Sequence, residues 1–138
     1  MKIIQLLILV YNADSGKWNA VVDSAKKVLQ IEGCTLCTIT HGITGERAQW
    51  KDCRAELGVH VQAYHKNEVP ENLRPVVADN FPCILAQYGE ETILLLTPEA
   101  MQECTGGVPD LKARIYRQAA VNGWKFPDPL KSAPLQVQ

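Results

Sequence analysis

An apolar run opens the chain. Residues 3–11 are apolar except for Gln5, a pattern typical of a strand that is covered on both faces in the middle of a parallel sheet. Asp14 or Ser15 can cap a helix after this strand, because a short oxygen side chain accepts hydrogen bonds from free N–H groups. A stripe of apolar residues at helical spacing then predicts that helix: Trp18, Val21, Val22, Ala25, Val28 and Leu29.

The next segments predict a strand, a helix and a strand. Cys34–His41 is rich in β-branched residues, which favour strands. Thr44 is a candidate cap for the helix that follows, and Gly58 ends it. The apolar side of this helix carries Ala48, Trp50, Cys53 and Leu57. Val59–His65 alternates between apolar and polar residues and predicts a third strand.

The second half of the chain carries a clear hairpin signal. Glu71–Asn80 predicts a weak helix or a loop, because a proline interrupts it. Cys83–Tyr88 and Glu91–Leu96 predict two strands joined by a tight Gly-Glu turn. A short helix is expected from Pro98 to about Cys104, and a longer one over Asp110–Val121.

This order of elements, β-α-β-α-β-(α)-β-β-α, predicts an α/β fold. Right-handed crossovers between the first strands give a mixed sheet with helices on both faces, and one further helix lies at the C-terminal end. A length of 138 residues fits one domain. We expect that domain to span residues 1–124, with an irregular, proline-containing tail over residues 125–138.

Composition narrows the class of protein. The chain is 46% hydrophobic and 21% charged, which is ordinary for a folded globule, and its net charge of −1 gives no reason to expect a nucleic acid or membrane partner. The N-terminal apolar run is shorter than the ~20 residues of a membrane span and predicts a strand in preference to a signal peptide. Five cysteines, an odd number, do not suggest a disulfide framework. We therefore expect a cytoplasmic protein without a cofactor.

A resemblance to the thioredoxin fold rests on Phe81-Pro82, which leads into Cys83–Ala86, a turn and Thr92–Leu96. It covers about residues 2–105. The resemblance implies that Pro82 follows a cis bond and borders the active site. It also implies redox cysteines between the first strand and the first helix, but residues 12–17 at that junction contain no thiol. The sequence therefore resembles a thioredoxin-like domain that lacks the usual redox site.

The sharpest local motif is Cys34-x-x-Cys37, followed by His41 and a glycine. This segment also resembles one found in a group of short bacterial proteins, a likeness that implies no activity. The spacing suits a redox pair or half of a metal site. On a strand, however, the two cysteines would lie ~10 Å apart, beyond the ~7 Å that a disulfide allows. Buried structural cysteines are therefore expected, and a redox pair or metal site requires a turn at residues 33–37.

The predicted topology also gathers polar residues at one sheet edge. Ligands of α/β proteins bind at the carboxyl ends of the strands. His41 could act there as a base or a hydrogen-bond donor, with Asp14 orienting it. The binding residues expected at this edge are Asn12, Asp14, Ser15, His41, Thr44, Phe81 and Pro82.

These patterns predict a module that binds a small molecule or a protein partner, and a second copy of the chain in a homodimer is one candidate partner. The alternative is a non-standard thiol oxidoreductase, or a metal-binding protein, that uses Cys34 and Cys37.

Overall fold

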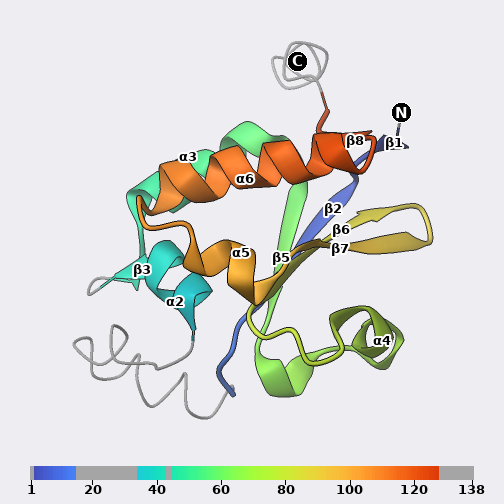
Figure 1. The fold of residues 1–138 in the computed structure, drawn as a ribbon, viewed down its shortest axis with the longest axis horizontal. Helices are drawn as coiled ribbons and strands as arrows, with labels where there is room; N and C mark the ends of the chain where they lie inside the picture. Colours follow the sequence, from blue (N-terminus) through green and yellow to red (C-terminus); the bar gives the residue numbers. More distant parts are fainter. Residues whose placement is uncertain (1, 15–33, 43–44, 128–138) are drawn as a thin grey trace, which may run out of the picture.

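The computed structural model describes residues 2–14, 34–42 and 45–127, and a four-stranded sheet lies at its centre (Figure 1). The strand order is β5-β2-β6-β7. β2 runs parallel to β5 and antiparallel to β6, and β6 runs antiparallel to β7. The sheet is therefore mixed, and the fold is of the α/β class. Its strands are β2 (Leu6–Val10), β5 (His60–Tyr64), β6 (Cys83–Tyr88) and β7 (Glu91–Leu96).

Two short strand pairs flank this sheet. β1 (Lys2–Ile3) pairs in parallel with β8 (Trp124–Lys125), and β3 (His41–Gly42) pairs with β4 (Gly45–Glu46). The predicted first strand is thus divided into β1 and β2. Gln5 lies at the division, and its side chain accepts a hydrogen bond from the backbone N–H of Gly89 at 2.8 Å. β2 remains the buried centre of the fold, as its apolar run predicts.

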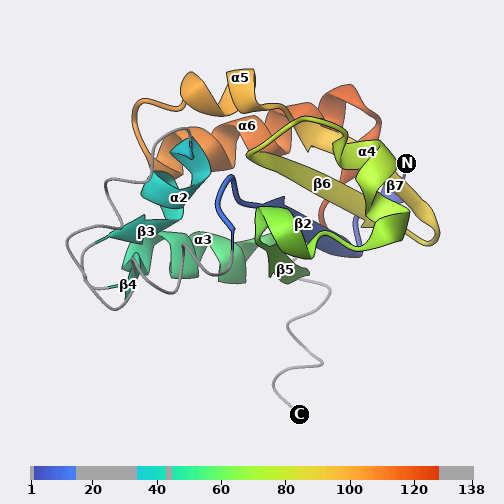
Figure 2. The same ribbon diagram turned by 90° about the horizontal axis from the view of Figure 1, so that it is seen from below.

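Helices lie on both sides of the sheet. α3 and α6 lie side by side on one face, and α4 lies on the other (Figures 1 and 2). The described helices are α2 (Thr35–Thr40), α3 (Ala48–Leu57), α4 (Arg74–Val77), α5 (Pro98–Gln102) and α6 (Val108–Val121), with two single 3-10 turns at Lys66–Glu68 and Glu71–Leu73. None of the helices in the described ranges has both the length and the apolar character needed to cross a bilayer.

The hairpin and α3 agree closely with the sequence prediction. β6 and β7 have the predicted bounds, and α3 buries the predicted Trp50, Cys53 and Leu57. Gly58 ends α3 in the left-handed region, with φ of 70°, where glycine is favoured. The predicted cap was wrong, because Arg47 and not Thr44 precedes the first turn. Thr44 itself, and the helix predicted between Ser15 and Leu29, lie outside the described residues.

The strand predicted over Cys34–His41 is wrong, because residues 35–40 form helix α2. Side-chain hydrogen bonds outweigh the strand preference of the β-branched residues. The Cys34 sulfur caps the first turn by accepting the Cys37 N–H. The hydroxyls of Thr38 and Thr40 donate to the carbonyls one turn earlier, at 2.8 and 3.0 Å, a bond that threonine makes readily in helices.

The start of the predicted C-terminal tail also differs from the prediction. Lys125 belongs to β8, and Phe126 is only 8% exposed. The Phe126 ring packs edge-on against Tyr116 of α6, with ring centroids 5.2 Å apart. The folded unit therefore extends to Phe126, while residues 128–138 lie outside the described part of the chain.

We expect Phe126→Ala to lower the free energy of unfolding by about 3 kcal/mol, because it removes a buried aromatic ring. Val121→Ala is the matched control. Val121 is 72% exposed, so its truncation should change stability by no more than about 0.5 kcal/mol. Urea unfolding of both variants measures the difference. Equal, small effects would show that Phe126 does not pack on the domain.

Candidate functional site

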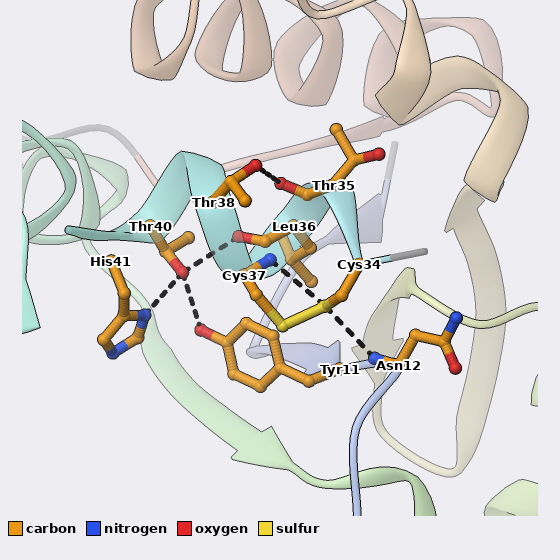
Figure 3. The surroundings of a disulfide bond; sticks show 9 residues. All are labelled: Tyr11, Asn12, Cys34, Thr35, Leu36, Cys37, Thr38, Thr40 and His41. Atoms are coloured by element: carbon orange, nitrogen blue, oxygen red, sulfur yellow. Dashed lines mark hydrogen bonds between the residues drawn. A yellow bond between two sulfur atoms is a disulfide. The ribbon is translucent and has the colours of Figure 1, made fainter. Parts of the chain in front are cut away.

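A disulfide between Cys34 and Cys37 closes the first turn of α2 (Figure 3). The two Cα atoms are 5.3 Å apart. A helix rises only ~1.5 Å per residue, whereas a strand would hold them ~10 Å apart. The expectation of two unpaired structural cysteines is therefore wrong, and its physical cause is the wrong secondary structure. The turn that a cysteine pair requires is present at these residues.

This disulfide lies at the end of β2. The backbone N–H of Asn12, just beyond β2, donates to Cys34 Sγ at 3.3 Å. The Cys37 N–H donates to the same sulfur, also at 3.3 Å. Residues 12–17, at the junction after the first strand, contain no thiol, and the sequence therefore predicted no thiol near this junction. That prediction is wrong, because the chain returns to the junction at Cys34.

Phe81-Pro82 lies at the same end of β2. Cys83 pairs with Val10, the last residue of β2, so the two residues before Cys83 continue past that strand end. The bond between Phe81 and Pro82 is cis, which confirms the prediction. Phe81 is half-buried, and the ammonium of Lys66 lies 5.4 Å from the centre of its ring. The predicted edge therefore brings together Asn12, the disulfide and Phe81-Pro82.

Thr40 joins α2 to β2 through a buried polar network (Figure 3). Its Oγ1 lies 3.0 Å from the Tyr11 hydroxyl, 2.8 Å from His41 Nδ1 and 3.0 Å from the Leu36 carbonyl. A threonine hydroxyl has one proton and can accept two hydrogen bonds. Since the carbonyl can only accept, Thr40 donates to Leu36 and accepts from both Tyr11 and His41. This assigns the proton of the His41 ring to Nδ1.

Burial keeps this network uncharged at neutral pH. It raises the pKa of Tyr11 to about 12, against a smaller opposing effect of the Thr40 hydrogen bond. It also lowers the pKa of His41, and Arg47 and Arg54 act in the same direction, while Glu46 opposes them. Tyr11 therefore stays protonated and His41 stays neutral at pH 7. In these forms both side chains can donate to Thr40.

A cavity of about 270 Å³ adjoins this network. Tyr11, His41 and Glu46 contribute polar lining, and Trp50 contributes apolar lining. Arg54 also lines the cavity and pairs with Glu46 at 3.0 Å. Within the described part of the chain, the buried Nε of Arg54 has no hydrogen-bond partner. The cavity is therefore a small, partly open hollow, and one of its lining residues carries a buried donor without a partner among the described residues.

The other predicted site residues have different outcomes. Asp14 is exposed, and His41 Nδ1 is bonded to Thr40. Ser15 and Thr44 lie outside the described residues. Tyr11 and Thr40 were missed, because Tyr11 ends an apolar run and Thr40 was placed on a strand; no local pattern links residues 29 positions apart.

The described residues contain no preformed metal site. Among the described residues, no group of three or more His, Cys, Asp or Glu side chains is arranged to hold a metal ion. In the disulfide state neither Cys34 nor Cys37 is a thiolate, which is the form that binds metals. A metal site through these cysteines stays a prediction for the reduced chain only.

We expect Thr40→Val to lower the free energy of unfolding by about 2 kcal/mol, because it removes the acceptor of one buried donor, Tyr11, and of one half-buried donor, His41. Thr38→Val removes a similar hydroxyl at a half-buried position on the same helix and should cost about 0.5 kcal/mol. Urea unfolding of the oxidised proteins compares them. Equal costs would contradict the account of the Thr40 network.

The chain matches no protein-family model, no curated protein and no solved structure. The chemistry of the site therefore has to be argued from its own geometry.

Proposed function

We propose that the protein is a thiol–disulfide oxidoreductase in which Cys34 and Cys37 are the redox pair. One observation carries this proposal. The two cysteines form a disulfide in the first turn of a helix, and that turn lies directly against the backbone that follows the central strand. A Cys-x-x-Cys pair at this position can cycle between dithiol and disulfide with little movement of the helix.

The arrangement of the sheet supports a thioredoxin-like fold. Parallel β2 and β5, followed by the antiparallel pair β6 and β7, agree with the order that the thioredoxin resemblance implies. Pro82 lies at the end of β2, near the same edge as Cys34. We therefore propose that the redox pair occupies the position of the thioredoxin-like active site. Its cysteines are residues 34 and 37, however, and do not lie at the junction directly after the first strand.

Cys34 is the better candidate for the nucleophile. Two backbone N–H groups point at its sulfur, those of Asn12 and Cys37. In the reduced protein, donors at this sulfur stabilise the negative charge of a thiolate. Both cysteines are buried, and the two N–H donors at Cys34 distinguish them. Cys37 is therefore suited to attack a mixed disulfide from inside the protein.

The reaction follows from these roles. The Cys34 thiolate attacks one sulfur of a substrate disulfide, so that a Cys34–substrate disulfide forms and the other substrate sulfur leaves as a thiolate, which takes up the proton of the Cys37 thiol. The Cys37 thiolate then attacks Cys34 Sγ, forms the Cys34–Cys37 disulfide and releases the second substrate thiolate, which water protonates. The substrate is reduced by two electrons and the protein is oxidised. An external dithiol reverses this change before the next cycle.

Burial limits which partners can react. Both sulfurs are almost fully enclosed, so a partner reaches Cys34 only when neighbouring groups move. The other three cysteines, Cys53, Cys83 and Cys104, are also buried, and burial raises the pKa of each thiol. They contain little thiolate at neutral pH and do not compete with the redox pair.

Binding of a small molecule at this edge is a second candidate function. The cavity beside Tyr11 and the unpartnered Nε of Arg54 favour it. Tyr11 lines the cavity and is hydrogen-bonded to Thr40 of the helix that carries Cys37.

We expect reduced Cys37→Ser to form a stable mixed disulfide at Cys34 with bis(2-hydroxyethyl) disulfide, because no second thiol can release the adduct. Cys34→Ser should form no adduct at Cys37. Cys53→Ser, which removes a buried thiol away from the pair, should turn over the probe like the wild type. Intact-mass and peptide mass spectrometry identify the modified residue.

A Cys37→Ser protein that stays unmodified, while its spectra show a native fold, would overturn the proposal. The disulfide would then be a structural cross-link. Equal adducts on the two single variants would instead contradict the assignment of Cys34 as the nucleophile.

A further inference from the structure

A second hollow, of about 400 Å³, lies on another side of α2, between that helix, the start of α3 and the connection from α5 to α6. This volume falls in the range of small-molecule sites, ~300–1,000 Å³. Its floor is apolar and buried, and consists of Ile39, Cys104 and Val108. Its rim is polar and includes Thr35, Arg47 and Gln102.

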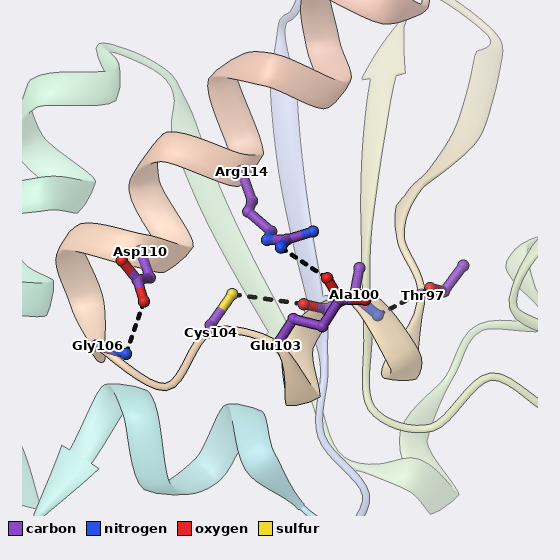
Figure 4. Close-up of polar contacts among 7 residues, drawn as sticks. All are labelled: Thr97, Ala100, Glu103, Cys104, Gly106, Asp110 and Arg114. Carbon is purple, nitrogen blue, oxygen red and sulfur yellow. Dashed lines mark hydrogen bonds and ion pairs between the residues drawn. The ribbon is translucent and has the colours of Figure 1, made fainter.

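The wall formed by the α5–α6 connection is held in place by hydrogen bonds (Figure 4). The Cys104 thiol donates to the Ala100 carbonyl at 3.5 Å, and the Gly106 N–H donates to Asp110 Oδ2 at 2.6 Å. On the opposite side, Arg47 Nε donates to the Thr38 carbonyl at 3.2 Å. Both sides of the hollow are therefore fixed before any ligand arrives.

The charge in this hollow comes from one residue. Among the described residues that line it, Arg47 alone is charged. The nearby carboxylates are engaged elsewhere: Asp110 accepts the Gly106 N–H, and Glu103 pairs with Arg114 at 2.7 Å (Figure 4). Since Nε of Arg47 is bonded to Thr38, the two terminal nitrogens of the guanidinium remain to bind a ligand.

We infer that this hollow binds a small organic monocarboxylate with an apolar body. A guanidinium binds a carboxylate through two parallel hydrogen bonds. The apolar floor formed by Ile39, Cys104 and Val108 takes up the body of such a ligand. A single cation matches a single negative charge better than the two charges of a phosphate. This inference does not depend on the redox chemistry of Cys34 and Cys37.

Three probes of different chemistry test this inference. Benzoate carries the charge and the apolar body, benzamide has the same shape without the charge, and inorganic phosphate has charge without an apolar body. In a ¹⁵N NMR titration of the oxidised protein, benzoate should shift the amides of Thr35, Thr38 and Thr105. It should bind roughly two- to fivefold more tightly than benzamide, which is the contribution of one exposed ion pair. Phosphate should bind more weakly than benzoate.

Matched variants separate a binding role of Arg47 from a structural one. Arg47→Gln should bind benzoate and benzamide equally, whereas Arg47→Lys should keep part of the preference. Arg117→Gln, which removes an exposed cation of α6 outside the hollow, should bind like the wild type. Equal affinity of the wild type for the two aromatic probes, absence of saturable shifts at the lining residues, or a preference that survives in Arg47→Gln would overturn the inference. The redox state is constant throughout, so failure here leaves the proposed redox function untouched.

Discussion

Two hydrogen bonds between the end of β2 and helix α2 determine the geometry of the site. The Asn12 N–H donates to the Cys34 sulfur, and the Tyr11 hydroxyl donates to Thr40. A helix of six residues is not stable alone in water, because helices shorter than about 12 residues gain too few hydrogen bonds. Its position therefore depends on these tertiary contacts. They hold the cysteine pair at the carboxyl end of the central strand.

The same contacts explain how a polar network can lie in the core. Thr40 is fully buried, and each of its three hydrogen bonds has a defined direction. A buried polar group that lacks a partner costs about 1–3 kcal/mol, so this satisfied network fixes one arrangement of α2 relative to β2. Burial keeps Tyr11 and His41 uncharged beside the disulfide. Among the described residues, the N–H groups of Asn12 and Cys37 donate to the Cys34 sulfur beside this network.

The sequence predicts the elements whose signals are local. The bounds of β6 and β7 follow from alternating apolar residues and a turn, and the buried face of α3 follows from helical spacing. Helix α2 was missed because half of the residues from Cys34 to His41 are β-branched, and propensity alone cannot include a cysteine cap or threonine hydroxyls that bond to the helix backbone. Some residues of the sites were missed for a related reason. Tyr11 and Thr40 meet only after the chain has returned to the end of β2, and Arg47 acquires its position from a carbonyl of α2.

The most direct test of the redox assignment is the equilibrium between the dithiol and disulfide forms of the native protein. The protein is equilibrated in mixtures of reduced and oxidised glutathione, quenched with an alkylating agent and analysed by peptide mass spectrometry. The account predicts that Cys34 and Cys37 change together from disulfide to two alkylated thiols as the mixture becomes more reducing. Cys53, Cys83 and Cys104 should stay unmodified until the protein is unfolded. A Cys34–Cys37 pair that remains in one state across all mixtures would contradict the assignment, as would a disulfide between either of these cysteines and a third.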